Sequence, residues 1–244
     1  MEIDASGKDY KSLNQQLRDI AASGVEILVL TNVLGQRYLG SGIKKEVEII
    51  IEGVPGNDLG AFMDGPVIKV RGNAQDVIGN TMNAGKIIIY GDAGDVVGYG
   101  MRGGKLFIKG DVGYRVGIHM KSYSSQVPVI VIGGSCGDFL GEYMAGGVLI
   151  VLGAHGRAED NAIIGSYIGT GMHGGVIYVR GTVEPHQLGK GVVINETDEN
   201  DEKNLEKYLA EFCREFGFEL DEIFSENFIK LVPASHRPYG DLYD

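Results

Sequence analysis

The sequence predicts an all-β fold in which short strands stack as successive coils of a β-solenoid. Three observations carry this prediction: a fixed repeat, regular aliphatic alternation and a high glycine content. In the repeat, a glycine precedes a methionine by three residues, and the first four of these glycines follow one another every 19 residues. A fixed period of this size is typical of stacked structural repeats. The pairs are Gly60 with Met63, Gly79 with Met82, Gly98 with Met101, Gly117 with Met120, Gly141 with Met144, and Gly169 with Met172.

Each repeat contains one short aliphatic strand that ends in glycine. Strands of about five residues leave no room for a helix within such a short unit, so leucine-rich and helical repeats are excluded. Neighbouring strands would lie about 4.8 Å apart, and about seven coils would form a stack roughly 30 Å tall. The strands with their closing glycines cover residues 49–53, 67–72, 87–91, 106–110, 129–133, 148–153 and 176–181.

Alternation within these strands predicts which side chains face inward. Counted back from the closing glycine, positions −2 and −4 are aliphatic in every copy, as a buried stripe with a period of two residues requires. We expect the flexible methionine side chains to fill the same narrow interior. Position −2 holds Ile51, Val70, Ile89, Ile108, Val131, Val151 and Val179, and position −4 holds Ile49, Ile68, Ile87, Leu106, Val129, Leu149 and Ile177.

The flanking segments predict covers for the two ends of the stack, because an open coil presents unpaired backbone groups. Residues 1–45 form the N-terminal cap, with a helix over Tyr10–Ala22 and a strand over residues 25–33. Residues 46–182 form the parallel β-helix. Residues 183–244 contain an acidic helix, Glu199–Phe216, and an extended tail that packs on the solenoid.

Position −3 predicts an interface, because it points outward and is nevertheless mostly apolar. The candidate interface residues are Ile88, Phe107, Ile130 and Ile150. Contiguous apolar side chains on an outer face indicate a buried contact. The sequence leaves open whether the chain's own tail or a partner protein covers this row.

Two kinds of motif resemble binding sites, one for dinucleotides and one for calcium, and the repeat itself explains both more simply. Residues 98–103 and 169–174 match the dinucleotide-binding fingerprint, but that motif works only at the start of a helix, and here a strand follows. Asp76, Asp95 and Asp138 share one turn position, where hydrogen bonds to nearby turn N–H groups explain them better than calcium does. We therefore predict no catalytic, cofactor-binding or metal-binding residues and no cofactor.

Histidine spacing gives no support for zinc, and two insertions are candidates for partner contacts. His119, His155, His173, His186 and His236 share no ligand spacing with each other or with cysteine. Residues 119–128 and 154–169 lengthen two coils, and solenoids often place such insertions on the binding side. The alternative is that both are tolerated loops.

Composition narrows the class of partner and the compartment. Glycine accounts for 39 of 244 residues, which tight corners between strands require. The net charge of −11 argues against nucleic acid. No run of 18 apolar residues and no signal sequence is present, so we expect neither a membrane-spanning nor a secreted protein. Cys136 and Cys213 are expected as reduced thiols in the cytoplasm.

The repeat also resembles a known family. Residues 94–110 and 137–153 follow the pattern G-D-x-φ-G-x-x-M-x-G-G-x-φ-x-φ-x-G, where φ is an apolar residue. This pattern resembles the GXGXG module, the C-terminal domain of the glutamate synthase large subunit. Residues 37–42 and 56–62 are similar to its opening stretch, and the likeness covers about residues 30–182. The resemblance implies a right-handed parallel β-helix.

The resemblance further implies a complex that moves the amide nitrogen of glutamine onto 2-oxoglutarate. There a glutaminase and an FMN/iron–sulfur synthase carry the chemistry, and the β-helix holds them in register. This chain starts with methionine rather than a nucleophilic cysteine, and two cysteines cannot ligate a cluster. We therefore expect a free-standing, non-catalytic scaffold subunit that docks glutaminase and FMN/iron–sulfur synthase subunits. Whether it self-associates is left open.

Two alternatives remain at this point. The same module also occurs as one of the subunits of formylmethanofuran dehydrogenase, so the repeat does not separate the two assemblies. The second alternative is a stand-alone β-helix enzyme acting on polysaccharides, which would need clustered acidic and basic side chains on one outer sheet. Position −1 offers Arg71 and Lys109 separated by Tyr90, and position −3 offers only Lys69.

Overall fold

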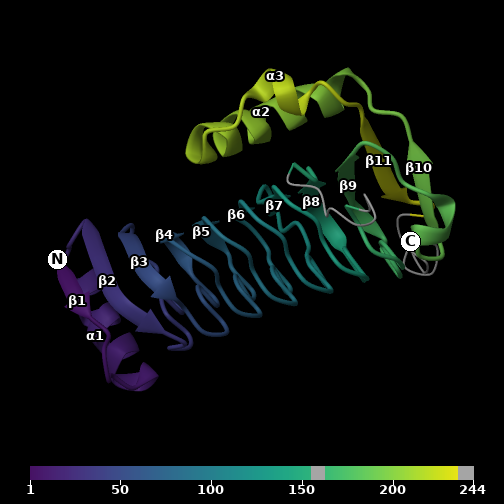
Figure 1. Ribbon diagram of the computed structural model, residues 1–244. Coiled ribbons are helices and arrows are strands. Elements are labelled where there is room, and N and C mark those ends of the chain that lie inside the picture. The colour runs from purple at the N-terminus through teal and green to yellow at the C-terminus, as the bar shows by residue number, and fades with distance from the viewer. Residues whose placement is uncertain (155–162, 236–244) are drawn as a thin grey trace.

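The computed structural model describes residues 1–154 and 163–235 of the chain. Figure 1 shows a row of strands stacked one on the next, with a helix at the N-terminal end and two helices lying along one side. The described residues form one eleven-stranded sheet in the order β1-β2-β3-β4-β5-β6-β7-β8-β9-β11-β10. The strands are β1 (Glu2–Asp4), β2 (Ile27–Leu34), β3 (Glu48–Val54), β4 (Asp64–Val70), β5 (Ala84–Ile89), β6 (Lys105–Ile108), β7 (Val129–Ile132), β8 (Ala145–Val151), β9 (Gly174–Arg180), β10 (Val192–Asn195) and β11 (Phe228–Pro233).

The strands from β1 to β9 pair in parallel with their neighbours, which confirms the predicted parallel solenoid. The register aligns equivalent repeat positions: Ile49 lies beside Ile68, and Ile68 lies beside Ile87. These side chains are buried in one continuous core that runs the length of the stack. The right-handed sense of the coils stays a prediction from the family resemblance.

The predicted methionine column fills the interior. Met63, Met82, Met101, Met120 and Met144 are completely buried, and Met172 is nearly so. The methyl groups of Met63, Met82, Met120 and Met144 each reach toward a glycine of the next coil. A Cβ atom placed on Gly104 would lie only 2.5 Å from Met82 Cε, and one on Gly175 would lie 2.5 Å from Met144 Cε. The glycine therefore provides the space that the methionine occupies.

The N-terminal segment contributes strands to the stack as well as a cover. Helix α1 spans Tyr10–Ala22, as predicted, and Asp9 caps it by accepting hydrogen bonds from the amides of Lys11 and Ser12. Its buried residues Leu13 and Leu17 join the solenoid core and close its end. The strand expected over residues 25–33 is β2, which pairs in parallel with both β1 and β3.

Strand β7 corrects the predicted inward and outward assignment of residues 129–132. Leu106 pairs with Ile130 and Phe107 pairs with Val131, so Ile130 and Ile132 face the core, whereas Val129 and Val131 face outward. The cause is a glycine pair at residues 133 and 134. The second of these, Gly134, takes the closing position and donates its N–H to the carbonyl of Gly110 in the previous coil.

The C-terminal segment closes the other end of the sheet. Helix α2 spans Glu199–Phe216 as predicted, with a capping box at Asp198 and a left-handed Gly217 at its C-terminus. The segment beyond α2 was predicted to be extended throughout, and it instead contains a helix and a strand. A short helix α3 (Leu220–Ile223) precedes β11, which pairs antiparallel with β9, and β10 pairs antiparallel with β11. A 3₁₀ turn, η1 (Pro185–Gln187), lies between β9 and β10.

The division of the chain at residues 45/46 and 182/183 stays a prediction, and the sheet itself runs across both points. Within the described ranges, no helix combines the length and the apolar character needed to cross a lipid bilayer.

Candidate interaction surfaces

The outer apolar row lies beneath the chain's own helix α2. Ile88, Phe107 and Ile150 belong to a second hydrophobic cluster, which they share with apolar residues of α2 and α3. The ring of Phe107 meets the ring of Phe212 edge to face, with centroids 5.7 Å apart. The fourth predicted interface residue, Ile130, does not belong to this row, because the register of β7 turns it into the solenoid core.

Polar contacts fix α2 at both of its ends. Near its C-terminal half, Lys86 and Lys105 of the solenoid both donate to the carboxylate of Glu211. At its first turn, the Tyr178 hydroxyl donates to Asp201 Oδ1 at 2.5 Å, and the Lys230 ammonium donates to Asp201 Oδ2 at 2.6 Å. The helix is therefore held by charge-assisted hydrogen bonds as well as by apolar burial.

These contacts shift the acid–base behaviour of the carboxylates. Burial alone would raise the pKa of Asp201, but the hydrogen bonds from Lys230 and Tyr178 outweigh it and hold the pKa below its usual range. Burial likewise opposes ionisation of Glu211, and the two lysines that donate to it lower its pKa overall.

An exposed aromatic column follows one corner of the stack. At the turn before each repeat methionine, three residues spaced two apart have positive φ. In the first coil these are Asp58, Gly60 and Phe62, and the third directly precedes Met63. Phe62, His119 and Tyr143 occupy this third position, with exposed fractions of 54% for Phe62 and 47% for Tyr143. The His119 ring stacks on Tyr143 at 5.3 Å and meets Tyr99 edge to face at 5.9 Å. We call these four residues the aromatic corner.

Three members of the aromatic corner, Phe62, His119 and Tyr143, combine positive φ with exposure. Positive φ is unfavourable for residues that carry a Cβ atom, and glycine takes the same position in two other coils, as Gly100 and Gly171. Every coil takes this backbone conformation, so exposure is what singles these residues out, and exposed aromatic side chains point to a contact with another molecule. The sequence carries a signal for this column, since aromatic residues recur directly before methionine, but none of the four is among the interface residues predicted from it.

A second set of rings lies at the first positive-φ position of neighbouring coils. Phe139 stacks on Tyr167 with centroids 5.0 Å apart, and the Arg115 guanidinium lies 4.5 Å from the Phe139 ring. Arg115 also forms an ion pair with Glu142, a buried carboxylate. The pair neutralises a charge that would otherwise be costly to bury.

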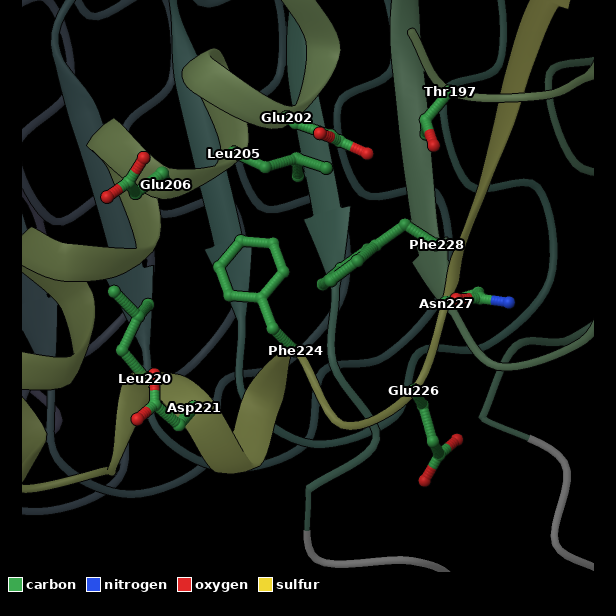
Figure 2. Close-up of a pocket in the computed structure, with 10 residues that line it drawn as sticks. All are labelled: Thr197, Glu202, Leu205, Glu206, Leu220, Asp221, Phe224, Glu226, Asn227 and Phe228. Atoms are coloured by element: carbon green, nitrogen blue, oxygen red, sulfur yellow. The ribbon is translucent and has the colours of Figure 1, made fainter. Parts of the chain in front are cut away.

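A pocket of about 440 Å³ opens between α2, α3 and β11. Figure 2 shows Phe224 and Phe228 at its centre, with the carboxylates of Glu202, Glu206 and Asp221 around them. The two rings lie 5.7 Å apart. The pocket therefore has an apolar floor and an acidic rim, and it contains none of the residues predicted as interface from the sequence.

The repeated aspartates tie coils together, which confirms that they accept hydrogen bonds from turn N–H groups. Asp76 Oδ1 accepts from the amide of Asp95 at 3.0 Å, Asp95 Oδ1 accepts from Tyr114 at 2.8 Å, and Asp138 Oδ1 accepts from Ser166 at 2.8 Å. Each donor lies in the following coil. No cluster of three or more potential metal ligands occurs in the part of the chain that the structure describes.

The two dinucleotide-like motifs are repeat corners, as expected. Residues 98–103 lead into β6 and residues 169–174 lead into β9, so neither opens a helix that could bind a pyrophosphate. His173 lies beside the second motif, and its Nδ1 is 3.4 Å from the carbonyl oxygen of Gly171. His186 lies in η1, while His155 and His236 lie outside the described residues.

The first insertion is a surface loop in which Tyr123 and Gln126 form an isolated bridge, and residues 121–127 are exposed. The second insertion is described only in part, because residues 155–162 lie outside the described ranges. Beyond that gap, Ile164 bridges in parallel to Cys136, and Ile168 to Leu188.

The fold and its glycine corners define a class of β-solenoid modules. The family model for the GXGXG motif matches residues 25–235, and the chain belongs to this family. A curated relative from Methanocaldococcus jannaschii, "Uncharacterized protein MJ1350", is 49% identical over 248 residues, covering 99% of this chain and 95% of the relative.

A solved structure has the same fold. It is a chain of the formyltransferase/hydrolase complex (FhcABCD) from Methylorubrum extorquens, whose structure was determined in complex with methylofuran. The superposition has a TM-score of 0.65 at 21% sequence identity and covers 96% of each chain. At this identity the likeness establishes the fold alone.

Proposed function

We propose that this chain is a non-catalytic scaffold subunit of a multi-subunit enzyme complex. The observation that carries the proposal is the aromatic corner, where Phe62, Tyr99, His119 and Tyr143 are exposed along the stacked coils. Exposed apolar patches of this kind mark sites of protein association. The rigid sheet behind them would hold a partner in a fixed position, which is the task of a scaffold.

Two assemblies fit such a subunit, and one of them has better support. The structural neighbour belongs to a formyltransferase/hydrolase complex and matches over 96% of this chain. This favours the alternative, the β-helix subunit of a formylmethanofuran dehydrogenase-like complex, over a scaffold for glutaminase and FMN/iron–sulfur synthase subunits. The family match is shared by both assemblies.

A polysaccharide-active enzyme has less support, because the basic side chains of the outer rows are engaged. Lys69 lies 3.4 Å from Glu48 and 4.0 Å from Glu215, and the Arg71 guanidinium lies 4.4 Å from the ring of Tyr90. An open row of acidic and basic groups for a sugar chain does not form there. We place the protein inside the cell as part of the same proposal.

The test is to purify the affinity-tagged chain from native cells and to identify stoichiometric partners by mass spectrometry. Recovery of formyltransferase or hydrolase subunits, or of pterin-binding dehydrogenase subunits, supports the favoured assembly. Recovery of a glutaminase together with an FMN protein supports the glutamate synthase type. Recovery of the chain alone from gently lysed cells, at its native concentration, contradicts the scaffold proposal.

A further inference from the structure

Three lysines gather in one open cleft of a chain whose net charge is −11. The cleft has a volume of about 550 Å³ and lies where α2 crosses the solenoid beside the 119–128 insertion. Lys86 and Lys105 come from the strands β5 and β6, and Lys207 comes from α2. A positively charged cleft on a chain with a large negative net charge needs an explanation, because its charge is opposite in sign to that of the chain as a whole.

The charges in the cleft do not cancel. Lys86 and Lys105 share one carboxylate, that of Glu211, so two positive charges meet one negative charge. Lys207 lies one helical turn before Glu211, and no carboxylate of the described residues lies within 4.0 Å of its ammonium group. The cleft therefore holds three positive charges and one negative charge, an excess of two.

Neutral hydrogen-bond donors line the same space. Ser125 reaches the cleft from the insertion, and Tyr208 lies beside Lys207 on α2. Gly85 and Gly104 also line it and leave room because they carry no side chain. Insertions in solenoids often lie on the binding side, and this insertion places Ser125 in the same cleft as the three lysines.

We propose that this cleft binds a small multivalent anion of the carboxylate or phosphate class. The ammonium groups of Lys86, Lys105 and Lys207 supply the charge, and the hydroxyl of Ser125 supplies a directional hydrogen bond. Glu211 competes with the ligand for two of the lysines and keeps them ordered while the cleft is empty. This proposal does not depend on the scaffold role.

The experiment is calorimetric titration of the full-length chain with inorganic pyrophosphate and, separately, with citrate. Binding by either anion that weakens as sodium chloride is added supports the site. Lys207→Gln is expected to weaken binding about fivefold, because it removes one of the unpaired charges. Lys203→Gln is the matched control, since Lys203 is a highly exposed lysine on the same helix that does not line the cleft.

Glu211→Gln gives a result that a nonspecific surface effect would not produce. Removing this carboxylate frees Lys86 and Lys105, so anion affinity should rise several-fold while the thermal unfolding midpoint falls. If this variant does not fold, the Lys207→Gln and Lys203→Gln pair decides alone. The proposal is overturned if neither anion binds at millimolar concentration, or if both lysine variants weaken binding equally.

Discussion

The hydroxyl of Tyr178 donates a 2.5 Å hydrogen bond to Oδ1 of Asp201, joining the outer face of β9 to the first turn of α2. Both groups are buried, so neither can exchange this bond for one with water. Tyr178→Phe should lower the free energy of unfolding by about 1–3 kcal/mol, because it leaves the carboxylate short of a donor. Urea denaturation at pH 7 measures this loss. Tyr123→Phe, at an exposed position, should leave stability unchanged.

The Asp201 carboxylate also predicts a pH dependence. Its pKa is held below the usual range in the folded protein, so its contribution to stability is fully present above the unfolded pKa of about 4. That contribution is lost as the pH falls through the lower folded pKa. Asp201→Asn should therefore reduce the slope of stability against pH in the acid range, although Glu211 still contributes to it. Superimposable slopes for wild type and variant would contradict this account.

Gly35 and Gly104 have nearly the same positive φ but different surroundings. Replacing each with alanine therefore distinguishes the cost of backbone strain from the cost of overfilling the core. Gly35 has φ of 77° with open space around its Cβ direction, and Gly104 has φ of 78° with Met82 Cε 2.5 Å away. Gly35→Ala should cost about 1 kcal/mol from the left-handed backbone alone. Gly104→Ala should cost at least about 2 kcal/mol more, because the new methyl overfills the core. Equal losses in chemical denaturation would show that the methionine column does not set the glycine positions.

Helix α2 should depend on one phenylalanine. The ring of Phe212 is completely buried and contacts Phe107 and Phe216, with centroid distances of 5.7 and 4.8 Å. Phe212→Ala should cost about 3–5 kcal/mol and increase amide hydrogen exchange throughout α2. The control is Leu34→Ala, which truncates an exposed side chain and should be nearly neutral. Unchanged exchange in α2 would mean that this ring does not hold the helix.

The aromatic corner should matter for association rather than for stability. Phe62 and Tyr143 are about half exposed and hold positive φ, so their truncation removes little buried surface. Replacing both with alanine should shift the thermal unfolding midpoint by only a few degrees, as expected for surface positions. A collapse of the midpoint measured by scanning calorimetry would assign these rings to the fold instead.

Much of this fold could be predicted because local signals and the repeat agree. Helices α1 and α2 begin and end where predicted, since Asp9, Asp198 and Gly217 provide capping chemistry that can be read locally. The inward rows follow from alternation in the strands with an unambiguous closing glycine.

What could not be predicted depends on partners far away in the sequence. Either Gly133 or Gly134 could close the strand before it, and only pairing of Leu106 with Ile130 decides between them. A shift of one residue exchanges the inner and outer faces, which is why Ile130 was misassigned. Likewise β10 and β11 form by antiparallel pairing at the end of the sheet, and that pairing leaves no periodic signal.

The measurement that tests the scaffold account most directly is the native size of the tagged chain in gently lysed source cells, determined by sedimentation. The wild-type chain should sediment with its partner subunits, well above the 26.2 kDa of one chain. The Phe62→Ala/Tyr143→Ala variant should sediment as a much smaller folded species, and the Tyr10→Ala control as the wild type does. A wild-type chain that sediments alone, or a corner variant that stays fully in the complex, would contradict the account.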